Sequence, residues 1–211
     1  MKKLLAILTF FGCALLLQAQ NVKPFIKAGQ EFFETGKYNE AVEQFTKAID
    51  LQPANADHYV KRARAYERLD EKLKAAEDYD NAITFDVKEE DWYNSAAKLY
   101  FQLQEYPKTI ERCKASLVLS MDYEILAIKV DALLKNKNYS EALLDAKLLV
   151  LKKSTDQNNY RFGIASEASG FDVDALKAYQ SAIDKNKRFF EAYTSLANLQ
   201  FKTKNSISAL A

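Results

Sequence analysis

The sequence predicts an all-α fold, an α-solenoid in which antiparallel helix pairs stack one on the next. Only 5 glycines and 3 prolines occur among 211 residues, too few turn residues for a many-stranded β-sandwich or barrel. No segment keeps the apolar–polar alternation that is typical of a strand. Small and aromatic side chains instead recur at helical spacing, and the same pattern returns 34 residues further on, as it does in arrays of repeated helix pairs.

The first twenty residues have the composition of a secretory signal peptide. Lys2 and Lys3 precede an uncharged apolar run over 4–17, and a short polar segment ends it. The run is shorter than the roughly 20 residues that a membrane-spanning helix needs. We therefore predict that residues 1–19 are a leader cleaved after Ala19, and that the chain is exported to the periplasm or the outer surface, or secreted. The leader is the only part of the chain expected to meet a membrane.

The two cysteines bear on anchoring and on redox chemistry. A lipidated cysteine closes its apolar run, whereas Cys13 follows Phe11-Gly12 and leads into further leucines, so a lipid anchor is not expected there. Export would leave Cys113 as the only cysteine in an oxidising compartment. Its place in the repeat pattern, usually that of a core aromatic, predicts a buried and inert thiol.

The repeat is clearest along one face of the second helix of each predicted pair. The matching residues, 34 apart from one repeat to the next, are Ala41, Phe45 and Ala48, then Ala75, Tyr79 and Ala82, then Thr109, Cys113 and Ser116. Within each set the spacing is i, i+4 and i+7, which is one face of a helix. The small residues let two helices approach closely, and the larger ones fill the space on the partner helix.

This pattern resembles the tetratricopeptide repeat (TPR) family. The first repeat carries the family's bulky, small and aromatic positions and its terminal proline, namely Phe25, Gly29, Phe32, Tyr38, Ala41, Phe45, Ala48 and Pro53. The resemblance covers about 22–211 and implies helix pairs that stack into a right-handed superhelix. It implies a binding scaffold without naming a partner, since this fold serves many.

The pattern divides an array over 20–211 into repeats. Their ranges are about 22–55, 56–89, 90–122, 123–155, 156–189 and a partial sixth over 190–211. In the fourth repeat Tyr139, Ala142 and Ala146 fix the second helix, but Lys129 falls at an apolar position of the first, which leaves the register open by one residue. Pro107 lies at the start of a second helix, where its missing N–H costs nothing.

The end of the sequence falls inside the sixth repeat. The pattern makes Ser206 to Ala211 the first turns of its second helix, and no polar-faced capping helix follows. We expect either a fragment of a longer chain or a natural chain whose last helix frays.

No catalytic or metal-binding constellation is recognisable in the sequence. The only histidine, His58, is expected as a solvated side chain at the exposed start of a helix, and Trp92 as a partly exposed rim residue. Gly163 and Gly170 lack the Lys-Ser or Lys-Thr pair of a phosphate loop, and the acidic stretch over 78–91 lacks calcium-loop spacing. We therefore expect no enzymatic activity, no cofactor and no metal. The net charge of +1 gives no basic surface excess, so we expect no nucleic-acid partner.

The family resemblance implies that the first helix of each pair lines a concave groove. The candidate groove residues are Gln30, Phe33, Lys61, Arg64, Arg68, Asn94, Lys98 and Phe101. Some family members clamp a peptide's C-terminal carboxylate, but Ile26, Gln30 and Lys61 depart from that residue set, so such a clamp is not expected. The basic members would instead hold an extended or acidic peptide. The sequence leaves open the alternative that these charges solvate a helix face and pair with Glu67 and its neighbours.

The predicted function is therefore non-catalytic binding of a protein or extended peptide in the bacterial cell envelope. One alternative is an N-terminal adaptor of a longer envelope protein or enzyme, whose catalytic or anchoring domain lies beyond residue 211. A third hypothesis is self-association through an exposed last repeat.

Overall fold

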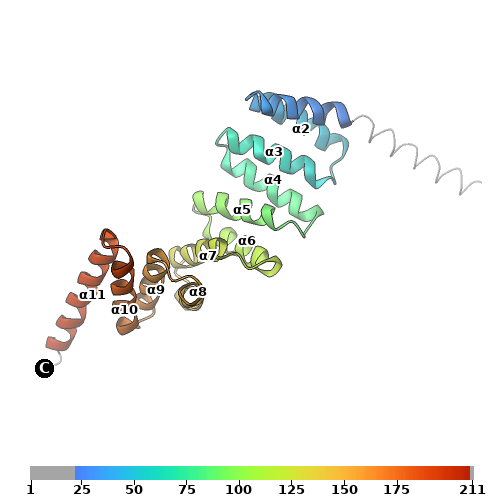
Figure 1. Cartoon of the computed structure of the whole chain (residues 1–211). Helices are drawn as coiled ribbons and strands as arrows, with labels where there is room; N and C mark the ends of the chain where they lie inside the picture. Colours follow the sequence, from blue (N-terminus) through green and yellow to red (C-terminus); the bar gives the residue numbers. More distant parts are fainter. Residues whose placement is uncertain (1–21, 210–211) are drawn as a thin grey trace, which may run out of the picture. The chain divides into compact units, whose positions relative to one another are not determined.

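The computed structural model describes residues 22–209, with side chains up to Lys204. The predicted leader, its cleavage site and Cys13 lie outside this range. Within 22–209 the chain forms helices and no strands, and these helices fall into two compact units (Figure 1). Unit 1 extends to Leu103 and unit 2 starts at Gln104. The prediction of an all-α solenoid built from helix pairs is confirmed.

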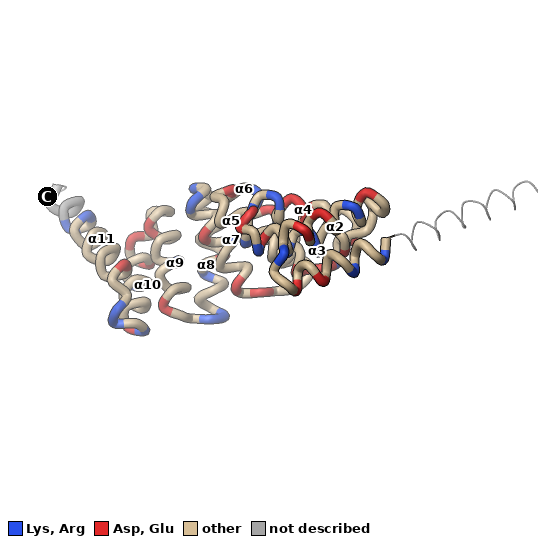
Figure 2. The backbone as a smooth tube through the Cα atoms, turned by 90° about the horizontal axis from the view of Figure 1, so that it is seen from above, with Lys and Arg blue, Asp and Glu red and all other residues tan. Residues whose placement is uncertain are grey.

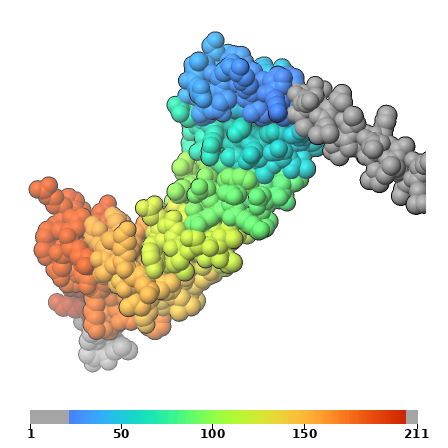
Figure 3. Space-filling model, turned by 45° about the vertical axis from the view of Figure 1, so that its right-hand side comes forward, coloured from blue at the N-terminus to red at the C-terminus, as the bar shows by residue number. Residues whose placement is uncertain are grey.

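Unit 1 contains five described helices. They are a helix over 22–34, α2 (Tyr38–Leu51), α3 (Ala56–Arg68), α4 (Lys72–Phe85) and α5 (Glu90–Gln102). From α2 to α5 each helix packs against the next one along the chain. Helices that are consecutive in sequence therefore appear as successive bands of colour on the surface (Figure 3).

The core of unit 1 consists of aromatic rings set against small residues. Phe45 of α2 and Tyr79 of α4 are both buried, each among alanines of the neighbouring helices. A Cβ added to Gly29 would lie 2.5 Å from Cε1 of Phe45, so glycine is what lets the ring reach the first helix. Trp92 is half-buried against the same core.

Unit 2 contains six helices among the described residues. They are α6 (Tyr106–Leu119), α7 (Tyr123–Lys135), α8 (Tyr139–Lys152), α9 (Asp156–Ala168), α10 (Asp172–Lys185) and α11 (Phe190–Ala209). Pro107 lies in the first turn of α6. Tyr123, Asp156 and Phe190, which begin α7, α9 and α11, are the residues at which the sequence places the starts of the last three repeats.

The core of unit 2 repeats the aromatic-on-small arrangement. Tyr179 of α10 is buried with its ring against Gly163 of α9, and its hydroxyl donates a 2.7 Å hydrogen bond to Oε2 of Glu167. Cys113 is fully buried, as the sequence predicts, and burial raises the pKa of its thiol to about 12. The thiol is therefore protonated at neutral pH and is a packing residue.

The buried cation at the apolar position of the fourth repeat has partners on α8. Nζ of Lys129 lies 2.9 Å from Oε1 of Glu141 and 2.8 Å from Oδ2 of Asp145. Burial alone would lower the pKa of Lys129, but the hydrogen bonds that its ammonium donates to these carboxylates outweigh burial and raise it. A lysine therefore replaces an apolar residue here because α8 supplies two acids.

The same left-handed turn follows five helices, namely the helix over 22–34, α3, α5, α7 and α9. The residues with positive φ are Gly36, Asp70, Gln104, Lys137 and Gly170, with φ between 59° and 81°. After this residue the chain folds back: the N–H of Lys37 donates to the carbonyl of Phe32, and that of Asn138 to the carbonyl of Leu133, both at 2.8 Å. These are the bonds of a Schellman motif, which ends a helix and starts a reversal of direction.

Two expectations from the sequence are wrong. Helix α11 runs without a break from Phe190 to Ala209, so Ser206 continues the first helix of the sixth repeat instead of starting a second one. The stretch contains neither Gly nor Pro to stop it. His58 is not solvated but 5% exposed, because the first turn of α3 packs against the end of α2.

Candidate protein-binding groove

The eight candidate groove residues all lie in unit 1, on the first helices of three successive pairs. Gln30 and Phe33 are on the helix over 22–34, the three cations Lys61, Arg64 and Arg68 on α3, and Asn94, Lys98 and Phe101 on α5. Val60 and Ala63 of the same helix pack into the core. This packing fixes which face of α3 carries the cations.

Four of the eight residues meet in one small hollow between the first helix and α3. Gln30, Phe33, Lys61 and Arg64 line it, and the ring of Phe45 closes it from below. Its volume is about 50 Å³, which suits one small side chain and not a whole ligand. The hollow combines an aromatic floor with two cations at its edge.

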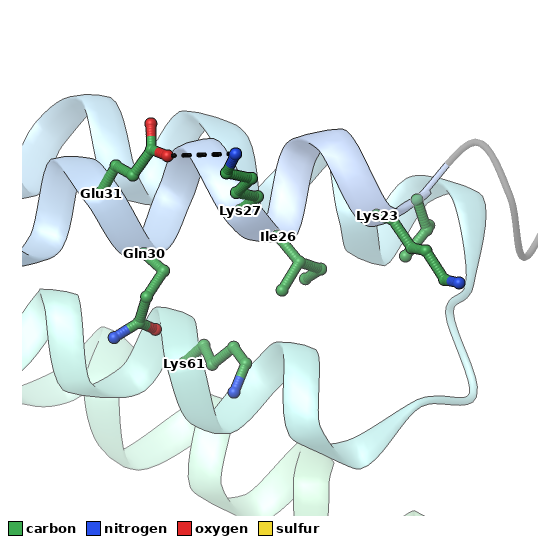
Figure 4. A pocket seen from close by; sticks show the side chains of 7 residues that line it. Lys23, Ile26, Lys27, Gln30, Glu31 and Lys61 are labelled. Atoms are coloured by element: carbon green, nitrogen blue, oxygen red, sulfur yellow. Dashed lines mark ion pairs between the residues drawn. The ribbon is translucent and has the colours of Figure 1, made fainter.

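A larger pocket of about 430 Å³ adjoins this hollow and shares Gln30 and Lys61 with it. Its other lining residues are Val22, Lys23, Ile26, Lys27 and Glu31. Figure 4 shows Ile26, Gln30 and Lys61 directed into the space between the first helix and α3. The two features together make a continuous groove of apolar, amide and cationic groups, which we call the unit 1 groove.

Three residues of this lining, Lys23, Lys27 and Glu31, are not among the eight candidates predicted from the sequence. Lys23 holds position 2 of the first repeat, which the TPR resemblance assigns to the groove, so that signal could have found it. Lys27 and Glu31 form an exposed ion pair at 3.8 Å (Figure 4). This pair is one turn apart on a helix surface and contributes little to stability.

The two cations of the smaller hollow, Lys61 and Arg64, are not neutralised within the described part of the protein. Lys61, Arg64 and Lys98 make no ion pair with any residue in the described range. Glu67 on α3 instead accepts a 2.5 Å hydrogen bond from the hydroxyl of Tyr79. Burial, and then this hydrogen bond, raise the pKa of Tyr79. The sequence leaves open an ion pair between the basic residues and Glu67. Lys61, Arg64 and Lys98 do not form that ion pair in the described structure.

Arg68 lies next to the groove and not inside either hollow. Its guanidinium carbon lies 4.9 Å from the ring centroid of Tyr38 and 6.0 Å from that of Phe33. The two rings contact each other edge to face, with centroids 5.5 Å apart. Arg68 therefore acts as a cation over an aromatic pair at the end of the first hairpin.

The three candidates on α5 line neither hollow. The amide of Asn94 donates to Oε1 of Glu90 at 3.5 Å, within its own helix. Lys98 is exposed and Phe101 is half-buried. The structure thus brings Gln30, Phe33, Lys61 and Arg64 together, and it leaves the α5 residues two helices beyond α3.

A buried ion pair holds the groove helix α3 against α4. Nε and Nη2 of Arg62 each lie 2.7 Å from an oxygen of Asp78, and Nη1 donates to Oγ1 of Thr46 at 3.0 Å. The hydrogen bond with Asp78 raises the pKa of Arg62. Lys129 and Asp145 occupy the equivalent positions in unit 2. The bidentate geometry fixes the rotation of α3 and with it the direction of the groove cations.

Other kinds of site find no support in 22–209. No group of three or more His, Cys, Asp or Glu side chains in this range is arranged to hold a metal ion. No helix of the described part has the length and apolar character that crossing a bilayer requires. Acidic and basic residues are interleaved along both units (Figure 2).

The chain matches the family model described as TPR repeat over residues 29–70. No curated protein sequence matches it. Among solved structures it is similar to YrrB, described as a TPR protein with an unusual peptide-binding site, with a TM-score of 0.71 and 16% identity over 82% of this chain and 90% of that one.

Two further structures have the same fold. MamA gives a TM-score of 0.68 at 15% identity, covering 82% of this chain and 96% of that chain. A tetratricopeptide repeat protein from Parabacteroides merdae gives 0.67 at 19% identity, covering 90% and 77%. At these identities the likeness concerns the fold.

The repeat pattern, the family match and the arrangement of helix pairs agree. Residues 29–70 match a TPR repeat, and the fold of the described chain is that of TPR proteins. TPR proteins are typically non-catalytic.

Proposed function

We propose that the chain is an exported, non-catalytic TPR scaffold whose unit 1 groove binds an extended, acidic segment of a partner protein in the bacterial cell envelope. One observation carries the proposal. Lys61 and Arg64 face a groove with an apolar floor, and neither has an ion-pair partner among the described residues.

The chemistry of the lining residues favours this class of ligand. Carboxylates of a partner would neutralise Lys61 and Arg64, while Ile26 and Phe33 would contact its apolar side chains. An extended chain also leaves its backbone N–H and C=O groups open to the amide of Gln30. Charge complementarity of this kind sets partner choice and association rate more than total affinity.

Export is supported by the order of charges and apolar residues over 1–20. Two lysines, an uncharged apolar run and a short polar segment are the three parts of a secretory signal. The peptide-binding site in the description of YrrB supports peptide recognition on a related fold. It does not identify which peptide this chain binds.

The test is affinity capture from envelope extracts with two charge-reversal variants. K61E/R64E reverses the groove cations, and K47E/K88E makes the same charge change at exposed lysines outside the groove residues. We expect the groove variant to lose partners that the wild-type chain and the control variant both retain, most clearly at low salt. Identical capture by all three proteins would exclude the groove as the binding surface.

A further inference from the structure

Unit 2 carries an apolar stripe on its solvent-facing side that its core does not require. Val118 of α6 is 85% exposed, and Leu144 and Leu151 of α8 are 70% and 78% exposed. Lys147 follows Leu144 by three residues and precedes Leu151 by four, so all three α8 residues share one helix face. We call Val118, Leu144, Lys147 and Leu151 the α6–α8 stripe.

An ion pair joins the two helices of the stripe. Nζ of Lys114 on α6 lies 2.9 Å from Oε1 of Glu141 on α8. The helices run in the same direction, since α7 packs antiparallel between them. Val118 is one turn beyond Lys114, and Leu144 is one turn beyond Glu141. The ion pair thus joins α6 and α8 within one turn of Val118 and of Leu144.

The repeat itself shows that apolar residues are not needed at these positions. In the next pair, α10 has Lys177 where α8 has Leu144, and Asp184 where α8 has Leu151. Both α10 residues are exposed. The leucines of α8 thus leave apolar surface in water without any gain in packing, and such exposed patches mark interaction sites.

The charge around the stripe is positive. Lys147, Lys152 and Lys153 are exposed and make no ion pair with any residue of the described chain. The nearby acids do not offset them, because Glu141 binds Lys114 and Lys129, and Asp145 binds Lys129. Burial alone would raise the pKa of Glu141, but the hydrogen bonds from Lys129 and Lys114 outweigh it and lower the pKa, so Glu141 stays ionised in this bridge.

We propose that the α6–α8 stripe docks unit 2 on an anionic lipid surface. Exposed fractions of 70–85% mean that these side chains project from the helices instead of lining a hollow. A bilayer interface accepts projecting apolar groups between its headgroups without a matching shape, whereas a protein partner would need complementary hollows. Lysines beside the apolar residues match anionic headgroups.

The contact is peripheral, since only one face of each helix takes part. It is also separate from the leader, the only part of the chain for which the sequence predicts membrane contact, and from the unit 1 groove. A protein bound at the unit 1 groove and a lipid surface at unit 2 would use different residues.

Vesicle flotation tests this proposal. The protein is the chain from residue 22 onward, because it contains every described helix and lacks the apolar run that would itself enter a bilayer. The vesicles are phosphatidylcholine alone or phosphatidylcholine with phosphatidylglycerol. We expect flotation with the mixed vesicles only, and a decrease of about five-fold or more in the bound fraction for V118S/L151S and for K147E/K152E.

Two single-substitution controls on α10 test whether the effect is specific to the stripe. V173S and K177E change exposed residues of α10 in the same chemical sense and should bind the mixed vesicles as the wild type does. Circular dichroism of each variant confirms that it is folded. The proposal is overturned if the wild type binds both vesicles equally or neither, or if V118S/L151S floats as well as V173S.

Discussion

The ring of Tyr179 occupies the space beside Gly163 that a larger residue would need. A Cβ at Gly163 would overlap the side chain of Tyr179, whose hydroxyl is held by Glu167. The ring cannot move away without losing this bond and its contacts with Tyr160. A single methyl group at this position therefore tests the aromatic-on-small packing.

Gly163→Ala is expected to lower the free energy of unfolding by about 1–3 kcal/mol, the usual cost of overpacking. Denaturant titration measures it. Gln180→Ala, on the exposed face of α10, should change stability by no more than about 0.5 kcal/mol. Equal effects of the two substitutions would contradict the close contact.

Removal of Asp78 would leave the guanidinium of Arg62 without its bidentate partner in a largely buried place. We expect Asp78→Ala to cost about 2–4 kcal/mol of unfolding free energy. The double variant R62M/D78L removes both charges and should recover most of the loss, because apolar residues can replace such a pair. If the double variant is no more stable than Asp78→Ala, an unpaired charge is not the cause.

The buried imidazole of His58 makes unit 1 sensitive to acid. Nδ1 of His58 has no hydrogen-bond partner among the described residues. Burial lowers the pKa of His58, with Asp57 opposing this effect and Lys61 adding to it. Because the folded-state pKa lies below the unfolded value of 6.5, the stability present above pH 6.5 is lost as the pH falls.

Unfolding free energies of wild type and His58→Gln should therefore diverge in slope below pH 6.5. The wild type should lose more, by at most about 1.4 kcal/mol per pH unit, the limit for one proton. Carboxylates titrate in both proteins, so the difference isolates His58. Parallel curves between pH 7 and 5 would show that His58 is protonated equally in both states.

For single residues, the sequence predicts which repeat positions are buried in the core better than it predicts which side chains contact each other. Cys113 could be placed in the core because its repeat position is an interior one. The prediction that His58 is exposed was wrong, because its burial depends on the position of the end of α2. The residue spacing around His58 does not determine that position. The hydrogen bond that the hydroxyl of Tyr79 donates to Glu67 joins side chains of two helices, and the sequence alone did not predict it either.

Helix pairs of this chain depend on left-handed turn residues that are not always glycine. Gly36 and Gly170 adopt positive φ without penalty, but Lys137 adopts φ of 62° with a full side chain. Its turn is otherwise a normal Schellman motif. The non-glycine residues at this position cost stability that the fold tolerates.

Lys137→Gly is expected to raise the free energy of unfolding by about 0.5–1 kcal/mol, since it relieves the left-handed strain. Lys135→Gly, two residues earlier in the last turn of α7, should lower it by about the same amount. Thermal and denaturant unfolding of both variants provide the comparison. A destabilised Lys137→Gly would mean that the lysine side chain stabilises the turn by contacts of its own.

Helices and their starts follow from the repeat pattern, whereas the last helix does not. The spacing of small and aromatic residues identifies α2 to α10 because each pair needs that spacing to pack. Beyond Phe190 the pattern predicts a second helix, but α11 continues to Ala209. A turn near Ser206 would be stabilised by a second helix packing against α11. The local sequence, which has no Gly or Pro there, does not by itself produce a turn.

The whole molecule combines two surfaces with different chemistry on two compact units. Unit 1 presents the unit 1 groove, and unit 2 presents the α6–α8 stripe. Four residues that the TPR resemblance assigns to the groove line one hollow, and their role in binding stays a prediction. The stripe could not, because exposed leucines at helical spacing look like core residues in sequence and only the structure shows which face is covered.

The most direct test of the groove is a binding titration with labelled extended peptides, acidic in one set and with Asn and Gln for Asp and Glu in a matched set. We expect wild type and K47E/K88E to prefer the acidic set at low salt, and K61E/R64E to lose this preference by about ten-fold or more. Equal affinity of K61E/R64E and wild type for the acidic peptides would contradict it.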